Sequence, residues 1–494
     1  MALTLGVNVL ETDGKASPSI QAAATSVAAF VIRSERGVPG AVRRVSSPGQ
    51  FKELFGSVIP NTFGALAVQG FFDNGGAVAY ITRVADTAVA EAATITLGTQ
   101  LNVTAGYRGE PDPGAWGDSL DVRVQANPVV ANAYDLVVRR NGTVVETWEK
   151  LDLNAPAAGP ARPPAKAIND PVTGSRYITV SVPNAVVTNP APGSFTSLAG
   201  GADDTLSGNA LVTALSNALH NFDAFTVQLV ACPESTDAAV VTAGLLYCEN
   251  RGDCMFIGAT PPGFDVDAAV TYGQGLQGNK VYGALYYPWI QVLDPIGNRV
   301  LIPPTGHVMG VYARIDFQRG IWKAPAGNEA RVLGALGTER AISDIDHTTL
   351  VKNGSVDAIR FIPGAGIVVD SSRTLSTNPL WLYVNVRLLF NFVKTSLKYG
   401  LRWVVQEPNT EELWKKVKVN TVTPFLMNLW RKGAFGPGAA EDVFSVKIDA
   451  DNNPPANIQQ GIFTVEVFFY PSRPAETVVI VVGQQEGASS ATEA

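Results

Sequence analysis

The chain has 494 residues, 46% of them hydrophobic and 16% charged, and a formal net charge of −7. This length and composition predict a packed globular protein of roughly two to four domains and exclude a largely disordered chain. The net negative charge argues against a general nucleic-acid binder, and no apolar run reaches the roughly 18 residues that a membrane-spanning helix needs.

The first element is a strand at the start of the chain. Apolar residues alternate there with small or polar ones: Leu3, Leu5, Val7 and Val9. A polar segment, Glu11 to Pro18, separates this strand from the next element. Because strand backbone groups need hydrogen-bond partners, we expect the strand to pair with a sheet edge that need not belong to its own domain.

A βαβ-like unit follows. Val27 to Ile32 is a short apolar run typical of a buried strand, and Ala77 to Val84 predicts a second one. Between them the pattern predicts helices at Gln50 to Phe55 and Phe63 to Phe72. We therefore expect the chain to begin its core here.

The composition changes from about Ala85 to Gly201, where Thr, Val, Asn, Pro and Gly dominate. Short strand patterns recur in this stretch: Asp121 to Gln125, Tyr134 to Arg139, Val144 to Trp148 and Tyr177 to Val182. The Asn141-Gly142 pair predicts a tight hairpin turn between two of them. This stretch is interpreted as an inserted, mostly antiparallel β domain.

Alternating helices and strands then resume. Phe225 to Ala231 predicts a buried strand, Ala238 to Arg251 a helix and Met255 to Ile257 another strand. The pattern indicates that an α/β domain continues after the insertion.

Two long helices are predicted near the end of the chain. The first opens at Pro379 after the cap Asn378 and ends at Gly400. The second begins at a capping box formed by Asn409 and Glu412 and is interrupted at Pro424.

The chain closes on two strand patterns. Gly461 to Tyr470 is strongly β-forming, and after a break at Pro471 to Pro474 a second apolar run covers Thr477 to Val482. Its apolar members are Val478, Val479, Ile480, Val481 and Val482. Both ends of the chain therefore carry a strand that a polar linker separates from the body.

Catalytic chemistry is not indicated. The three histidines, His220, His307 and His347, stand outside metal-ligand spacings. Asp344 and Asp346 precede His347, but such residues more often cap a helix than form an acid–base pair. There is no Gly-x-Ser-x-Gly elbow and no phosphate-binding loop. We expect no catalytic, cofactor-binding or metal site and no enzymatic activity.

Cysteine usage and the N-terminal residues bear on location. Cys232, Cys248 and Cys254 do not fit a zinc pattern and are predicted to be buried free thiols. The first residues lack the basic segment and long apolar run of a secretory signal. We expect cytoplasmic assembly without direct membrane insertion.

A local basic region contrasts with the acidic chain. Between Arg387 and Lys432 there are nine Lys and Arg residues against three Glu. Five lysines on the two predicted helices could form one basic face: Lys394, Lys398, Lys415, Lys416 and Lys418. Two interpretations stay open, a solvated helix surface or a docking face for an acidic partner.

Three consecutive segments carry a family resemblance. Asn378 to Arg387, Gln406 to Trp414 and Phe425 to Ala434 resemble the C-terminal domain of contractile-tail sheath proteins. Gly310 to Asp316 and Gly320 to Asn328 resemble the stretch that joins the middle and C-terminal domains of that family. The insertion, from about 91 to 199, has no counterpart that we can match.

The resemblance implies an α/β and α+β multidomain protein. It would have a core with βαβ-like elements, an inserted antiparallel β domain, a helical-plus-sheet C-terminal domain and extended terminal strands. The implied division is 1–20, N-terminal linking arm; 21–90, N-terminal part of the core; 91–205, inserted β domain; 206–375, middle domain of subtilisin-like shape; 376–475, C-terminal sheath domain; 476–494, C-terminal linking arm and tail.

The resemblance also implies a function. Such subunits form stacked rings around an inner tube, in phage tails, bacteriocins or contractile injection systems, and contract from a metastable extended state. The implied partners are further copies of the chain, the inner tube protein, and baseplate and terminator or cap proteins, with no nucleic acid and no cofactor. The terminal strands would link neighbouring subunits, and the five lysines would face the tube. The alternatives are a cytoplasmic α/β hydrolase and a monomeric binding module.

Overall fold

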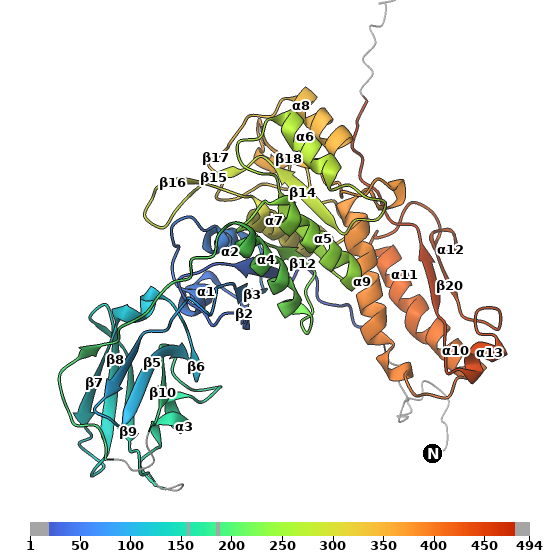
Figure 1. Ribbon diagram of the computed structural model, residues 1–494. Helices are drawn as coiled ribbons and strands as arrows, with labels where there is room; N and C mark the ends of the chain where they lie inside the picture. Colours follow the sequence, from blue (N-terminus) through green and yellow to red (C-terminus); the bar gives the residue numbers. More distant parts are fainter. Residues whose placement is uncertain (1–18, 156–158, 184–187, 480–494) are drawn as a thin grey trace, which may run out of the picture.

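The computed structural model describes residues 19–155, 159–183 and 188–479. Its centre is an eight-stranded sheet with the order β19-β18-β14-β13-β12-β1-β3-β2 (Figure 1). The strands are β1 (Ala28–Ile32), β2 (Val42–Val45), β3 (Ala79–Arg83), β12 (Leu229–Ala231), β13 (Met255–Ala259), β14 (Gly283–Tyr287), β18 (Val356–Ile362) and β19 (Gly366–Val369). The six inner strands are parallel, and β2 and β19 pair antiparallel at the two edges.

The inner strands are short apolar runs because both faces of the sheet are covered. All five residues of β1 are fully buried. Phe30 and Ile32 contribute to one core, whereas Ala29 and Val31 contribute to the core on the opposite face. The predicted βαβ unit is confirmed, since β1 and β3 pair in parallel with Ala28 opposite Ala79.

Helices cover both faces of the sheet. On one face are α1 (Pro48–Phe55), α2 (Gly64–Asp73) and α7 (Thr305–Arg319). On the other are α4 (Gly208–Ala218), α5 (Ala238–Arg251) and α6 (Val266–Gly275). A short α8 (Asp344–Thr349) leads through a π-helical turn into β18. A small sheet of β15 (Ile290–Leu293), β16 (Arg299–Ile302) and β17 (Gly337–Thr338) lies beside this body.

Helices α2 and α7 pack unusually closely, and glycines make the approach possible. A Cβ atom on Gly306 would lie 2.0 Å from the carbonyl oxygen of Ala67. A Cβ on Gly70 would lie 2.1 Å from the His307 ring. Neither position therefore has room for a side chain.

The insertion between β3 and α4 consists of two antiparallel sheets around a separate core (Figure 1). One sheet holds β4 (Thr94–Leu97), β5 (Leu101–Tyr107), β6 (Glu110–Pro111) and β10 (Ile178–Ser181). The other holds β7 (Leu120–Ala126), β8 (Tyr134–Arg140), β9 (Thr143–Leu151) and β11 (Thr196–Ser197). A short α3 (Pro164–Ile168) packs against β10. Positive φ angles of 49° at Asn141 and 79° at Gly142 confirm the predicted hairpin turn.

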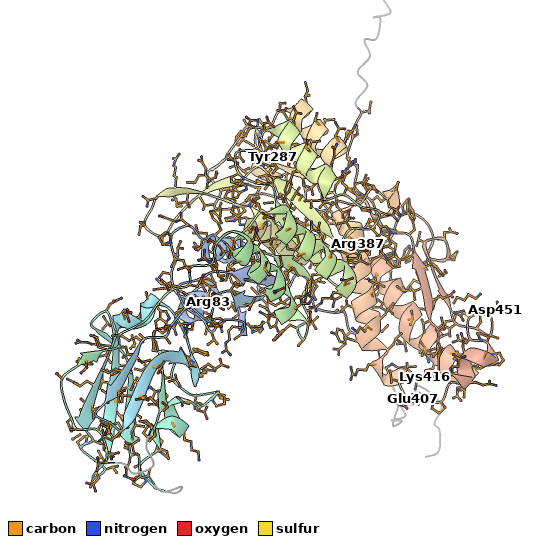
Figure 2. The ribbon with its side chains drawn as sticks, in the orientation of Figure 1. Arg83, Tyr287, Arg387, Glu407, Lys416 and Asp451 are labelled. Atoms are coloured by element: carbon orange, nitrogen blue, oxygen red, sulfur yellow. The ribbon has the colours of Figure 1, made fainter. Side chains whose placement is uncertain are left out.

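A buried charge network joins the insertion to the sheet. Asp112 of the insertion is fully buried and lies 3.4 Å from Arg36 and 3.2 Å from Arg83. Its other contact is a hydrogen bond from the Gly37 amide at 2.8 Å. The Arg36 guanidinium also stacks 4.1 Å from the Trp116 ring. Arg83 thus marks the junction between the two parts (Figure 2).

The C-terminal region is mostly helical. It contains α9 (Val384–Gly400), α10 (Glu411–Lys415), α11 (Thr423–Arg431), α12 (Ala440–Val443) and α13 (Pro455–Gln459). A two-stranded sheet joins β20 (Phe444–Lys447) to β21 (Glu466–Phe469). The apolar side chains of this C-terminal region belong to the same core cluster as those of α2 and α7. The region therefore packs directly onto one face of the central body.

The first predicted C-terminal helix starts later than expected. Asn378 does act as a cap, but it caps only a 3₁₀ turn, Pro379–Trp381. Tyr383 is extended and forms a β-bridge with Arg373, so α9 begins at Val384. The pairing of distant backbone segments overrides the local helix signal here. The predicted end at Gly400 is confirmed.

The second helix also differs from the prediction. Its cap is Thr410, whose hydroxyl accepts from the Leu413 amide, and not Asn409. The side chain of Asn409 instead accepts a 2.7 Å hydrogen bond from the Trp414 indole. Pro424 does not interrupt the helix. A π-helical turn, Lys416–Val422, precedes α11, so Pro424 falls in the first turn of that helix. Backbone N–H groups of a first turn have no carbonyl partner within the helix, and a proline is tolerated there.

Candidate functional site

The C-terminal hairpin is the clearest surface for contact with another chain. Within the described residues, no third strand pairs with either β20 or β21. A two-stranded antiparallel sheet is only marginally stable alone, and an open strand edge is a template for further pairing. The hairpin can therefore accept additional strands.

One face of this hairpin packs on the helices. Phe469 stacks on Phe390 of α9 at 4.2 Å and lies 5.1 Å from Phe435. The opposite face presents Phe468, which is 62% exposed. The α9 region therefore holds one face of the hairpin, while Phe468 on the other face is exposed and neither edge pairs with a further strand among the described residues.

The segment after β21 is fixed to the body and does not form a loose linker. Pro471 forms a bridge with Phe435, and the Asn385 amide donates to the Ser472 carbonyl at 3.1 Å. Glu476 then accepts from Nε and Nη2 of Arg373 at 2.7 and 2.6 Å. The chain is thus held at several points up to residue 476.

The residues beyond this point carry the predicted C-terminal strand. Val478 and Val479 are each 78% exposed and belong to no strand in this single chain. Ile480, Val481 and Val482 lie outside the described residues. So do the four residues of the predicted N-terminal strand: Leu3, Leu5, Val7 and Val9.

The five lysines do not share one environment. Lys394 on α9 is exposed, but its ammonium donates to the Gly252 carbonyl at the end of α5, where a positive charge complements the helix dipole. Lys398 follows one turn later and is exposed. Lys415 and Lys416 are exposed and Lys418 is half-buried; the Lys416 ammonium lies 4.8 Å from the Trp403 ring. Figure 2 shows Lys416 at the end of the region remote from Arg387.

The candidate catalytic groups have structural surroundings. Ser343 and Asp346 form a capping box at the start of α8, as predicted for the acidic residues before His347. His220 and Asp223 form a surface pair 3.4 Å apart. Within the described part of the chain, no group of three His, Cys, Asp or Glu side chains could hold a metal ion. No described helix is long and apolar enough to cross a membrane.

The cysteines are buried and free, as predicted. The sulfur atoms of Cys248 and Cys254 lie 3.4 Å apart. Burial raises the pKa of Cys248 well above its ordinary value, which disfavours the reactive thiolate.

The sheet reverses its strand order between β1 and β12, the position where doubly wound enzymes bind ligands. Here Glu234 fills that position. Its carboxylate accepts hydrogen bonds from the amides of Arg33, Phe63 and Gly64 at 3.1, 3.2 and 2.8 Å. Desolvation nonetheless raises the pKa of Glu234 to about 7. The N-terminus of α2 is thus already occupied by an acidic group of the chain itself.

Two family profiles match most of this architecture. The phage tail sheath protein central domain matches residues 208–375, and the phage tail sheath C-terminal domain matches residues 376–484. Together they cover more than half of the chain. The chain belongs to the phage tail sheath family. It is thus a structural sheath protein of a phage tail or a related contractile particle, as the resemblance implied.

Solved sheath structures share the fold. The contracted helical sheath of the anti-feeding prophage is 20% identical, with a TM-score of 0.58 over 98% of this chain and 100% of that chain. The contracted PVC sheath, from an extracellular contractile injection system, is 18% identical, with a TM-score of 0.60 over 98% and 99%. A Listeria innocua sheath tail protein is 13% identical, with a TM-score of 0.62 over 87% and 90%. A comparison with curated protein sequences gives no significant match.

One feature of this sheath protein was not found from the sequence. The Arg373–Glu476 pair fixes the root of the C-terminal arm, yet its partners are 103 positions apart. Glu476 is the sole acidic residue between Pro471 and Gln485, and this isolation is the only sequence signal that points to it.

Proposed function

We propose that this sheath protein polymerises as a helical cylinder around an inner tube and contracts from a metastable extended state, driving the tube through a target envelope. The observation that supports the proposal is that strand edges among the described residues of a single subunit are left without partner strands. The β20–β21 pair has no third strand on either edge within the described residues. Val478 and Val479 belong to no strand there, and the sequence predicts one further strand at each end of the chain.

Strand addition between copies would supply the partners, because a terminal strand of one subunit would pair with the open sheet edge of another. An extended segment that joins an open sheet edge gains backbone hydrogen bonds, and alternate side chains enter pockets along the edge. In this proposal the N-terminal run, Leu3 to Leu10, and the C-terminal run, Thr477 to Val482, add to the β20–β21 sheets of neighbouring subunits. The division into linking arms (1–20 and 476–494), core (21–90 and 206–375), insertion (91–205) and C-terminal sheath domain (376–475) follows from this role.

The energy for contraction would come from the subunits themselves. Subunits assembled on a tube are held apart, and a contracted state that buries more surface between them is lower in free energy. Because the arms are hydrogen-bonded strands, they can keep the polymer continuous while the bodies move. No cofactor is required by this mechanism.

Other partners follow from the same role. They are the inner tube protein, the baseplate, and a terminator or cap, with assembly in the cytoplasm. The tube-facing surface that we propose is formed by Lys394, Lys398, Lys415, Lys416 and Lys418. Lys394 also donates to the Gly252 carbonyl of its own chain. Exposed charges of this kind form weak, screened contacts, which suits a template that is released on contraction.

Two truncations test the strand exchange. A chain without residues 1–16 and a chain without residues 478–494 should each remain folded and monomeric, because the only described residues removed, Val478 and Val479, are exposed and belong to no strand. Neither should form long cylinders when purified alone. If either truncated chain assembles as the full chain does, its arm does not link subunits. Replacing only Lys398 and Lys415 by Glu should leave tube-free assembly intact and impair assembly on the tube.

A further inference from the structure

The root of the C-terminal arm forms one wall of a cavity of about 920 Å³. The other walls are the loop after α7, the end of α8 with the turn that follows it, Arg360 of β18, the residues after β19, the start of α9 and Gly433. We call this cavity the arm-root pocket. It belongs neither to the hairpin nor to the lysine face described above.

The arm-root pocket is strongly basic, although the chain as a whole is acidic. Six Lys and Arg side chains line it, against two acidic ones, Asp370 and Glu476. Asp370 pairs with Arg360, and Glu476 pairs with Arg373. Three cations form no ion pair within 4.0 Å among the described residues: Lys323, Lys352 and Arg473. Of these, Lys352 is near enough to Glu476 to lower the pKa of that carboxyl. The lining of the pocket therefore carries a net positive charge.

Two buried polar atoms at the pocket, Oδ1 of Asn385 and Nε2 of His347, have no hydrogen-bond partner in the part of the chain that the structure describes. Asn385 is 2% exposed, and its amide nitrogen donates to the carbonyls of Trp322 and Ser472 at 2.8 and 3.1 Å. Both partners are acceptors, so the amide orientation is fixed and its oxygen is the atom that has no donor. Among the described residues, Nε2 of His347 likewise has no partner, while its Nδ1 lies 3.6 Å from a carboxylate oxygen of Asp370.

These unmet groups define the chemistry of a ligand. The lysine and arginine side chains would bind a carboxylate or another anion, whereas the Asn385 oxygen would accept a hydrogen bond from an N–H or O–H donor. A simple inorganic anion offers acceptors but a poor donor. A peptide with an Asp or Glu side chain offers both, the carboxylate for the cations and a backbone N–H for Asn385. Glu476 shows that a carboxylate of this chain already binds in one corner.

We propose that the arm-root pocket binds an acidic segment of a second copy of this chain. The proposal rests on the proposed polymerisation. The wall formed by residues 472–477 continues directly into the arm that would reach a neighbour, so copies that share an arm are brought close to this pocket. The excess of acidic over basic residues in the chain provides the complementary charge.

Zero-length cross-linking tests this contact directly. A carbodiimide joins a lysine amine to a carboxylate that touches it, and sheaths assembled from a mixture of ¹⁴N- and ¹⁵N-labelled chains distinguish contacts between copies from contacts within one. We expect mixed-isotope cross-links from Lys323 or Lys352 to Asp or Glu. Assembled sheaths that give only the intrachain Lys352–Glu476 product, or none, would overturn the proposal.

A matched pair of variants provides a second readout. Lys323→Gln with Lys352→Gln should raise the concentration needed for assembly by about tenfold. Lys52→Gln with Lys166→Gln, at two exposed lysines outside the pocket, should leave it unchanged. Equal assembly of both variants would contradict the proposal. So would a pocket that binds inorganic phosphate, seen as stabilisation of the free subunit, while assembled sheaths give no cross-links between copies. Failure of the wild-type chain to assemble would instead refute the proposed function on which this contact depends.

Discussion

Glu476 binds Arg373 through two parallel hydrogen bonds and so fixes the C-terminal arm to the body at the residue just before its apolar run. The guanidinium lowers the pKa of Glu476 below its ordinary value. Because the folded-state pKa is the lower one, the pair stabilises the anchored arm at neutral pH, and this contribution is lost as the pH falls below about 4.5.

Glu476→Gln should loosen the arm root without unfolding the body. The pair is partly solvent-exposed, so its loss should cost no more than about 1 kcal/mol. Hydrogen exchange of residues 472–477 should accelerate several-fold, while the central sheet stays protected. Glu329→Gln removes the exposed Arg319–Glu329 pair and serves as the control, which should leave exchange at the arm root unchanged. Unchanged exchange in Glu476→Gln would show that the pair does not hold the arm.

Asp112→Ala should destabilise the chain severely. It would leave the guanidiniums of Arg36 and Arg83 buried without their carboxylate, a change that costs about 3–5 kcal/mol. Chemical denaturation measures the loss. Glu110→Gln removes the exposed Arg43–Glu110 pair, which spans the same junction, and should cost under about 1 kcal/mol. Similar decreases in the free energy of unfolding in the two variants would mean that burial does not determine how much these ion pairs contribute to stability.

His307 should make stability depend on pH. Burial lowers its pKa to about 4, whereas an unfolded histidine titrates near 6.5. The unfolded chain therefore binds the extra proton first, and stability should fall by up to about 3 kcal/mol as the pH drops from about 6.5 to 4. His307→Gln should flatten this part of the curve. His220→Gln, at an exposed histidine, should retain the wild-type slope, and a slope that persists in His307→Gln would assign it to another group.

Gly306→Ala should disrupt the contact between α2 and α7. The added Cβ would lie 2.0 Å from the Ala67 carbonyl oxygen, and the rigid backbone there has no space to yield. A loss of about 3 kcal/mol is expected. Gly275→Ala, at the end of α6, meets no atom within 4 Å and should be neutral or slightly stabilising. A Gly306→Ala chain with wild-type thermal stability would contradict the close packing.

Elements with complete local signals were predictable from the sequence. The helix predicted from Ala238 to Arg251 has these bounds in the structure, because the Asp237 side chain caps its start and Gly252 takes the left-handed conformation at its end. The start of α9 was not predictable from local signals alone. It depends on a bridge between Tyr383 and Arg373, which only the folded chain brings together.

The same distinction applies to the candidate sites. Terminal strand patterns and the basic helices are visible in the sequence, since each depends on neighbouring residues. The partners of individual side chains are not, as Lys394 illustrates, because its contact with Gly252 joins residues 142 positions apart. The arm-root pocket likewise brings together side chains that are far apart in the chain, from Arg319 to Thr477.

The central claim is that this chain builds a contractile cylinder, and electron microscopy of negatively stained samples tests it most directly. The full-length chain should be imaged alone and after assembly with its inner tube protein. Hollow helical cylinders that are wide without the tube and narrower around it are the predicted result. A small, monodisperse particle in both samples would contradict the account.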